Sequence, residues 1–134
     1  MAKPPEFSDR PASIEEYLTL REDAGMGGYK FEAAQRGLAN GLHGVWLRDE
    51  IGRLIAMGRL VGDGGCFAQV TDIVVHPEYQ RQGYGKRIMT ELMDWAEGNL
   101  AEGCYVSLIA DPGAETLYEA FGFEYRTGMA RRIS

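Results

Sequence analysis

The stretch from 70 to 95 constrains the fold of this chain most, because its periodicity changes from that of a strand to that of a helix. A β-branched run with Val70, Ile73, Val74 and Val75 predicts a strand. Pro77 ends it, because proline brings no donor to a β-ladder. A glycine-containing loop follows over 80–85, and apolar side chains then recur at helical spacing up to Trp95. The chain therefore passes from a strand through a tight loop into a helix N-terminus.

This loop has the properties of an anion site. A helix N-terminus offers backbone N–H groups without helical acceptors and the positive end of the helix dipole. Gly83 and Gly85 let the backbone approach a phosphate closely, because they carry no Cβ. Arg81, Lys86 and Arg87 add positive charge. The alternative is a plain glycine turn between a strand and a helix.

Size and composition narrow the class of protein. The 134 residues predict one domain over 1–134. A net charge of −6 argues against nucleic acid as a partner. We expect no signal peptide and no membrane association, because the first residues lack an apolar core and no apolar run approaches the length of a span. Cys66 and Cys104 lack metal-ligand or CxxC spacing, so we expect reduced thiols, no metal and a cytoplasmic location.

The remaining pattern predicts a mixed α/β fold. Ser13 and Glu16 form a capping-box pattern that starts a first helix, and a second short helix is expected over 31–39. Three strands joined by short turns then predict an antiparallel meander. A strand reached through the following helix is expected to be parallel to the last of these. The expected strands are 43–48, 53–61, 66–75 and 105–110, the later helices 83–99 and 114–120, and one or two closing strands lie within 123–134.

Two motifs in this order resemble those of the GNAT superfamily of acyl-CoA-dependent N-acetyltransferases. The first is Gln80-x-x-Gly83-x-Gly85, preceded by V-V-H-P-E-Y. The second is the stretch A-E-T-L-Y-E-A-F-G-F over 114–123, which looks like the family's short tyrosine-bearing helix ending in Gly-Phe. The resemblance implies an α/β fold of the α+β type. Its central, mostly antiparallel sheet is splayed at the acetyl-CoA site and flanked by about four helices.

The resemblance also implies a donor site. The loop backbone would bind the pyrophosphate of acetyl-CoA, and the exposed backbone of the preceding strand would pair with the pantetheine amides as an added strand does. Asp111 stands where the family often has an asparagine that contacts the pantetheine arm, although an ionised aspartate cannot donate as asparagine does. The implied donor-site residues are Ile73, Val74, Val75, Arg81, Gln82, Gly83, Tyr84, Gly85, Lys86 and Asp111.

Tyr118 and Asp72 are the catalytic candidates. Tyr118 lies where the family places a general acid, and a phenol can protonate the thiolate that leaves when an amine attacks a thioester. Its alternative role is packing. Asp72 is the general-base candidate, because it is the only carboxylate in its strand. Its alternative role is a structural carboxylate, and His76 is a second candidate base that more often caps or faces solvent.

The acceptor is expected to be a primary amine of a small molecule. The family builds its acceptor pocket from the connection between the first helices and from the closing strands, here 26–31 and 125–131. A protein or peptide acceptor and a non-catalytic acetyl-CoA-binding module are the alternatives. The segment 129–132 also offers an exposed strand edge, which predicts a possible homodimer. A Rossmann-type dinucleotide site is excluded, because the glycine loop follows an antiparallel meander and no suitably placed acidic residue ends a following strand.

Overall fold

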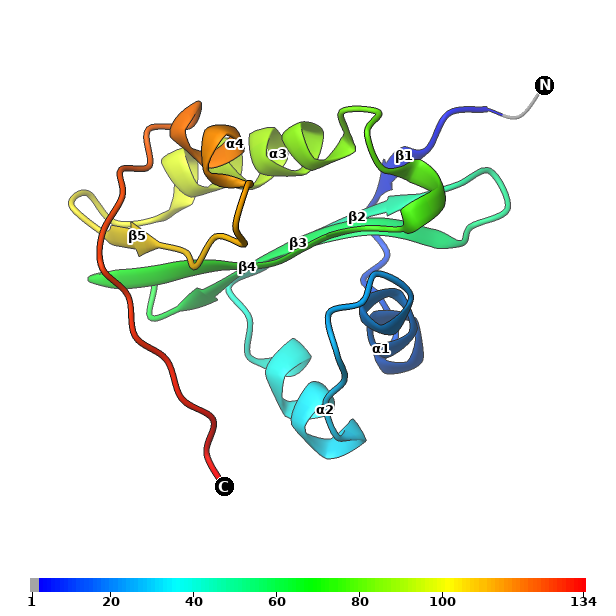
Figure 1. Ribbon diagram of the computed structural model, residues 1–134, viewed down its shortest axis with the longest axis horizontal. Coiled ribbons are helices and arrows are strands. Elements are labelled where there is room, and N and C mark those ends of the chain that lie inside the picture. Colours follow the sequence, from blue (N-terminus) through cyan, green and yellow to red (C-terminus); the bar gives the residue numbers. More distant parts are fainter. Residues whose placement is uncertain (1–2) are drawn as a thin grey trace.

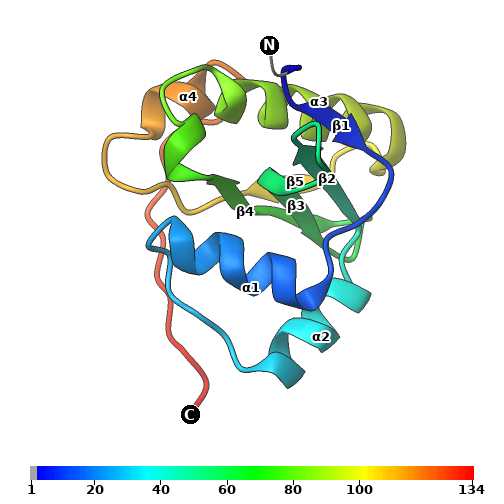
Figure 2. The same cartoon turned by 90° about the vertical axis from the view of Figure 1, so that its right-hand side faces the viewer.

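The structure, a computed structural model, describes residues 3–134 and consists of three layers (Figure 1). A five-stranded sheet of order β1-β2-β3-β4-β5 forms the middle layer. Helices α3 and α4 cover one face, and α1 and α2 cover the other (Figures 1 and 2). The elements are β1 (Glu6–Ser8), α1 (Ile14–Asp23), α2 (Phe31–Ala39), β2 (His43–Arg48), β3 (Leu54–Gly62), β4 (Phe67–Val75), a 3-10 turn (Pro77–Tyr79), α3 (Tyr84–Asn99), β5 (Tyr105–Ser107) and α4 (Glu115–Glu119).

The predicted antiparallel meander is confirmed. β2 pairs antiparallel with β3, and β3 pairs antiparallel with β4. Aspartate side chains close both connections: Asp49 Oδ1 accepts from the backbone of Ile51 and Arg53, and Asp63 Oδ1 accepts from three consecutive N–H groups over 65–67. Such side-chain acceptors are the reason why aspartate recurs in tight turns. The short turns hold the three long strands in one sheet.

Helix α3 lies close against the sheet because β3 carries a glycine at the contact. A Cβ built on Gly58 would lie 2.5 Å from Ile88 Cγ2 and 2.8 Å from both Ile73 Cδ1 and Leu92 Cδ1. Ile88 and Leu92 are fully buried, as their helical spacing predicts. Any larger residue at position 58 would push the helix from the sheet. Gly58 therefore allows α3 to lie close against β3, next to the strand that precedes the loop.

A second core fills the space between the sheet and the helices α1 and α2. Tyr17 and Leu20 of α1 pack there with Met57 and Val74 of the sheet. The predicted capping box at the start of α1 is confirmed, since Glu16 N donates to Ser13 Oγ over 3.1 Å and Ser13 N donates to Glu16 Oε1 over 2.9 Å. This core holds α1 across the lower face of the sheet (Figure 2).

Strands β4 and β5 form a fork. They pair in parallel only from Phe67–Tyr105 to Gln69–Ser107. The predicted strand 105–110 is therefore too long, because after Ser107 the chain leaves β4. The rest of β4 then has an unpaired edge on this side within residues 3–134. The predicted mixed α/β fold, with a splayed, mostly antiparallel sheet and four helices, is confirmed.

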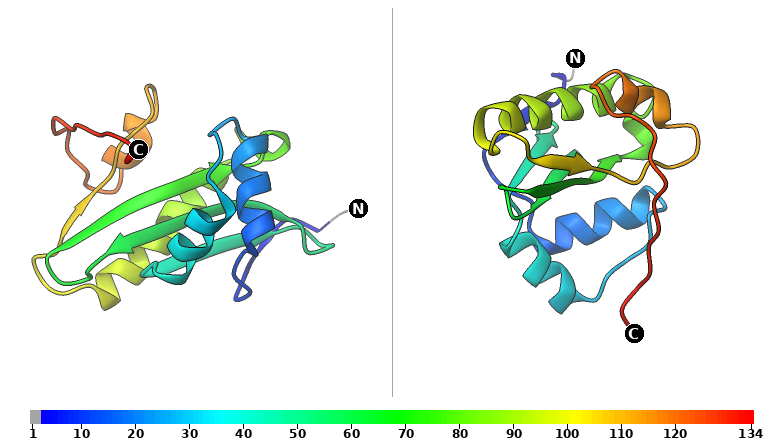
Figure 3. Two further views of the ribbon diagram at one scale, coloured as in Figure 1. Left: turned by 90° about the horizontal axis from the view of Figure 1, so that it is seen from below. Right: turned by 90° about the vertical axis from the view of Figure 1, so that its left-hand side faces the viewer.

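The predicted closing strands are wrong for the structure as described. Residues 123–134 contain no strand and run as an extended segment from α4 past β5 to the side of α2 (Figures 1 and 3). A strand needs a backbone partner, and from residue 124 onward this segment has none within the described residues. Among the helices of residues 3–134, none has the length and apolar character needed to span a bilayer.

Candidate active site

The loop between β4 and α3 ends in an uncapped helix N-terminus. Gly83 is the N-cap with φ +85°, and no side chain caps it. Arg81 also has a positive φ, of 64°. The first helical hydrogen bond runs from Arg87 N to Gly83 O over 3.2 Å, so the amides before Arg87 have no helical acceptor. No acidic residue lies in the first turn. The loop therefore presents unshared donors to an anion, which fits the phosphate site that its sequence predicts.

Gln80 holds this loop against the strand before it. Its side-chain amide donates to the Val75 carbonyl over 2.9 Å. His76 Nδ1 accepts from Glu78 N over 3.1 Å and so caps the 3-10 turn. The capping alternative for His76 is thus supported, and its Nδ1 is occupied. The sequence analysis used Gln80 only as part of the glycine-loop motif and did not predict its hydrogen bond to Val75. Its place as the first residue of the motif was the one sign that it has such a role.

A bulge in β4 lies beside the fork. Met57 pairs with Val74, but two residues later in β3 the register has shifted, because Arg59 pairs with Thr71, which lies three residues before Val74. Asp72 and Ile73 thus face Gly58 alone, and Asp72 has φ +55°. Ile73, Val74 and Val75 follow the bulge, beyond the last β4–β5 pair. Their open backbone edge is where the sequence predicts the pantetheine contacts.

Helix α4, which carries Tyr118, contacts the start of α3 through Leu117. A Cβ on Gly85, at the start of α3, would lie 3.7 Å from Leu117 Cδ2, so the two helices meet there. Tyr118 is half-buried, and its hydroxyl has no hydrogen-bond partner within residues 3–134. Burial and, secondly, the carboxylate of Asp111 raise the pKa of Tyr118 above its ordinary value. The phenol therefore remains protonated at neutral pH. Asp111 itself is exposed.

Asp72 is the centre of a buried polar cluster. Tyr17 Oη donates to Asp72 Oδ2 over 2.6 Å, and Arg59 Nη1 donates to the same oxygen over 3.0 Å. Arg21 donates to the other oxygen. Asp72 is only 6% exposed. Burial and, secondly, the hydrogen bond to Asp72 raise the pKa of Tyr17, which keeps its hydroxyl a donor. Because three side chains occupy the carboxylate, its contacts favour the structural alternative over a general base.

The same cluster fixes the connection between α1 and α2. Arg21 Nη2 donates to the Met26 carbonyl over 3.0 Å, and the Arg21 guanidinium lies 4.9 Å from the centre of the Tyr29 ring. Arg59 Nη2 donates to the Gly37 carbonyl over 2.8 Å. The bulge of β4 is thereby joined to the segment expected to form the acceptor pocket. Arg21 and Asp72 are 51 positions apart, and no local pattern in the sequence indicates that they meet.

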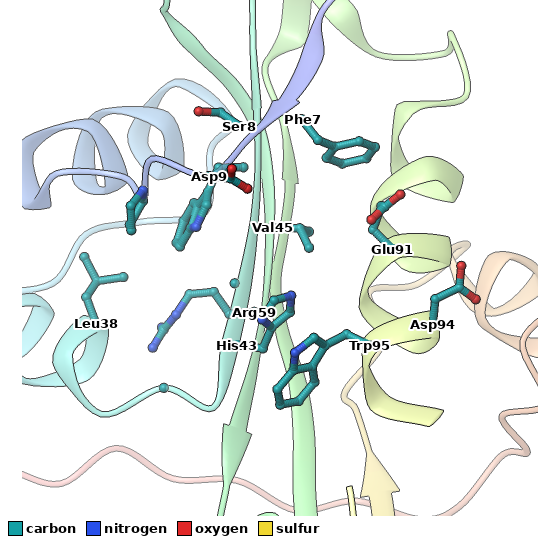
Figure 4. Close-up of a pocket in the computed structure, with 14 residues that line it drawn as sticks. Phe7, Ser8, Asp9, Leu38, His43, Val45, Arg59, Glu91, Asp94 and Trp95 are labelled. Atoms are coloured by element: carbon teal, nitrogen blue, oxygen red, sulfur yellow. The ribbon is translucent and has the colours of Figure 1, made fainter. Parts of the chain in front are cut away.

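A hollow of 740 Å³ lies elsewhere, along the outer edge of β2 (Figure 4). His43 stacks on Trp95 there, with ring centres 4.4 Å apart, and Glu91 and Asp94 project from α3 on the same side. None of the residues that line it belongs to the predicted site. Within residues 3–134, no group of three His, Cys, Asp or Glu side chains is arranged to hold a metal ion.

Solved structures share this fold. A protein of unknown function from meticillin-resistant Staphylococcus aureus, described as a probable acetyltransferase, is 41% identical with a TM-score of 0.88, and the match covers 96% of this chain and 99% of that one. A GNAT-family acetyltransferase from Streptococcus pneumoniae is 28% identical with a TM-score of 0.75, over 99% and 98% of the two chains.

Curated relatives match over part of their length. An uncharacterized ycf52-like N-acetyltransferase of Prochlorococcus marinus is 31% identical over 117 residues, which is 85% of this chain and 64% of the relative. A chloroplastic serotonin N-acetyltransferase 2 of Oryza sativa subsp. japonica is 35% identical over 83 residues, 59% of this chain and 40% of the relative. The chain thus spans less than two thirds of the length of these relatives.

A family model matches the part of the chain that contains the candidate site. The model of the GNAT acetyltransferase domain matches residues 41–125. This range runs from the start of β2 to just beyond α4, and so includes the loop, the fork and Tyr118. Since the match covers more than half of the chain, the chain belongs to the GNAT family of acetyltransferases.

Proposed function

We propose that the protein is an acetyl-CoA-dependent N-acetyltransferase that acts on a primary amine of a small molecule. One observation carries this proposal: the uncapped N-terminus of α3 follows directly from β4, whose edge is unpaired beyond Gln69, and α4, which carries the half-buried Tyr118, contacts the first turn of α3. The family membership supports the same activity. A cytoplasmic location and a single domain over 1–134 stay predictions.

The donor site is assembled from two segments. The backbone amides from Arg81 to Lys86 bind the pyrophosphate, because they lack helical acceptors and lie at the positive end of the helix dipole. The backbone from Ile73 to Val75 binds the pantetheine amides as an added strand does. Asp111 lies at the far side, between β5 and α4. Acetyl-CoA supplies the activated acetyl group.

Tyr118 acts as the general acid. The amine nitrogen attacks the thioester carbonyl carbon, a C–N bond forms and the C–S bond breaks. The hydroxyl of Tyr118 gives its proton to the leaving sulfur, and the amine releases its own proton to water. The phenol is protonated at neutral pH because its ordinary pKa already lies well above 7, and burial raises the pKa of Tyr118 further. Asp72 stabilises the site indirectly: it binds Arg21, and Arg21 in turn donates a hydrogen bond to Met26 in the α1–α2 connection.

The test is thiol release from acetyl-CoA across a panel of acceptors. The panel contains small amines, amino acids, polyamines, aminoglycosides, arylalkylamines and basic peptides. Arylalkylamines belong in it because the rice relative is named a serotonin N-acetyltransferase. We expect turnover with a small amine. Turnover confined to peptides would replace the small-molecule acceptor with a protein one. Acetyl-CoA binding without turnover would favour the non-catalytic alternative.

A further inference from the structure

The two cysteines of the chain lie opposite each other where β4 and β5 begin (Figure 1). Cys66 comes one residue before β4, and Cys104 comes one residue before β5. The first pair of the parallel ladder is Phe67 with Tyr105, and Tyr105 N donates to the Cys66 carbonyl over 2.8 Å. Cys66 and Cys104 are therefore the next facing positions before the ladder, and both are free thiols.

Two turns fix the backbone around these cysteines. Ala101 N donates to the Gly64 carbonyl over 3.1 Å, so the turn before β5 is bonded to the turn before β4. Within its own turn, Cys66 N donates to Asp63 Oδ1 over 2.9 Å. Cys104 N likewise donates to the Ala101 carbonyl over 3.0 Å. The bond between the turns and the first bond of the ladder lie on either side of the cysteine pair, and together they fix its separation.

Both thiols are on the same face of the sheet. Side chains alternate between the two faces along a strand, and paired positions of neighbouring strands share a face. Phe67 and Tyr105 share one face, since their ring centres lie 6.3 Å apart. Ala68 is on the opposite face, in the core that α3 covers. Cys104 packs against this core and Cys66 precedes Ala68 by two positions, so both sulfurs are on the α3 face.

The spacing of neighbouring strands suits a disulfide at this place. Adjacent strands lie about 4.8 Å apart, and disulfides join Cα atoms that are about 4.4 to 6.8 Å apart. Burial first, and then the carboxylate of Asp63 and the thiol of Cys66, raise the pKa of Cys104, which agrees with a close pair. Cys66 is exposed and Cys104 is partly buried. A small reagent in solution therefore meets the sulfur of Cys66 first.

We propose that Cys66 and Cys104 form a reversible disulfide when the protein meets a small-molecule disulfide. The Cys66 thiolate attacks one sulfur of that molecule, a mixed disulfide forms and a small thiolate leaves. The Cys104 thiolate then attacks the sulfur of Cys66, the new S–S bond forms and the second small thiolate leaves. Two protein thiols are oxidised, one small disulfide is reduced, and the two thiol protons pass to the solvent. The bond adds a covalent link to a ladder of three residue pairs.

The test is treatment of the folded full chain with oxidised glutathione. We expect mass spectrometry to show that both thiols are lost, that no glutathione is retained, and that digestion yields a peptide linked between Cys66 and Cys104. The thermal midpoint of unfolding should rise by about 5 °C or more, because the bond closes a loop that contains β4 and α3. A reducing agent should reverse both changes. Cys104→Ser is the matched control, which should keep one glutathione on Cys66 and show no such rise.

Several outcomes would overturn the proposal. A stable glutathione adduct on Cys66 beside a free Cys104 would mean that the two sulfurs do not meet, and a covalent link between two molecules would mean the same. A link that forms in concentrated urea but not in the folded protein would mean that the fold keeps the thiols apart. A linked chain without a higher thermal midpoint would mean that the native backbone does not accept the bond. These readouts do not depend on turnover, so they leave the proposed function unaffected.

Discussion

Asp72 has a left-handed backbone conformation, and three buried side chains bind its carboxylate. Asp72 lies in the bulge of β4, where two arginines and Tyr17 reach it from two other elements. Arg21 and Arg59 are 5% and 7% exposed, so Asp72 is the counter-charge of two buried cations. Removing one member of a buried charge cluster lowers the free energy of unfolding by more than the whole cluster contributes to it, because the remaining charges stay buried without a partner.

Asp72→Asn should therefore destabilise the protein strongly. We expect a loss of about 3 kcal/mol in the free energy of unfolding, because Arg21 and Arg59 lose their counter-charge in the interior. Urea denaturation measures it. Asp94→Asn, at an exposed position of α3, is the matched control and should change stability little. A variant that keeps the stability of the unmodified protein but loses most of its kcat would instead restore the general-base hypothesis for Asp72.

Tyr118→Phe tests the general acid at the same scale. The change removes one hydroxyl from a half-buried ring that packs against Phe123, and so leaves the packing intact. We expect kcat to fall about 100-fold with the acetyl-CoA dissociation constant unchanged. Steady-state kinetics with the best acceptor, together with calorimetry, measure both quantities. Tyr105→Phe, an exposed phenol on β5, is the control. Near-normal kcat would make Tyr118 a packing residue.

At the scale of elements, the sequence correctly predicted the helices and strands that depend on interactions between residues close in sequence. The capping box of α1, the three meander strands and α3 lie within one residue of their expected bounds, because caps, turns and periodicity are encoded by neighbours in sequence. β5 is shorter than expected and the closing strands are absent, because pairing at an edge depends on a distant partner. The Asp72 cluster joins three elements, α1, β3 and β4, and no local pattern in the sequence indicates it.

Gly83→Glu tests the N-terminus of α3. The variant places a side chain and a negative charge at the uncapped amides, at a backbone position with φ +85°. We expect acetyl-CoA binding to be lost in calorimetry, with the helix content retained. Gly98→Glu adds the same charge near the other end of α3, where a Cβ meets nothing within 4 Å. That control should bind normally. Equal affinities in both variants would remove the phosphate assignment.

At the scale of the whole molecule, the candidate site is shared between parts that contact each other sparingly. α3 is fixed to the sheet by Gly58 and its fully buried face, whereas α4 packs against the same core only through partly buried side chains, among them Leu117, Tyr118 and Phe121. A ligand that touches the loop, the β4 edge and α4 together joins these parts. Its binding free energy then adds to the stability of the folded state.

Acetyl-CoA should accordingly raise the thermal midpoint of unfolding. At a concentration one hundred times its dissociation constant, the expected stabilisation is about 2.7 kcal/mol. Differential scanning calorimetry measures it, and Gly83→Glu should show no rise. Tyr118→Phe should show the full rise, because its hydroxyl serves the chemical step and not donor binding. A rise that persists in Gly83→Glu would place the donor away from the α3 N-terminus. A rise lost only in Tyr118→Phe would make that hydroxyl a donor-binding group.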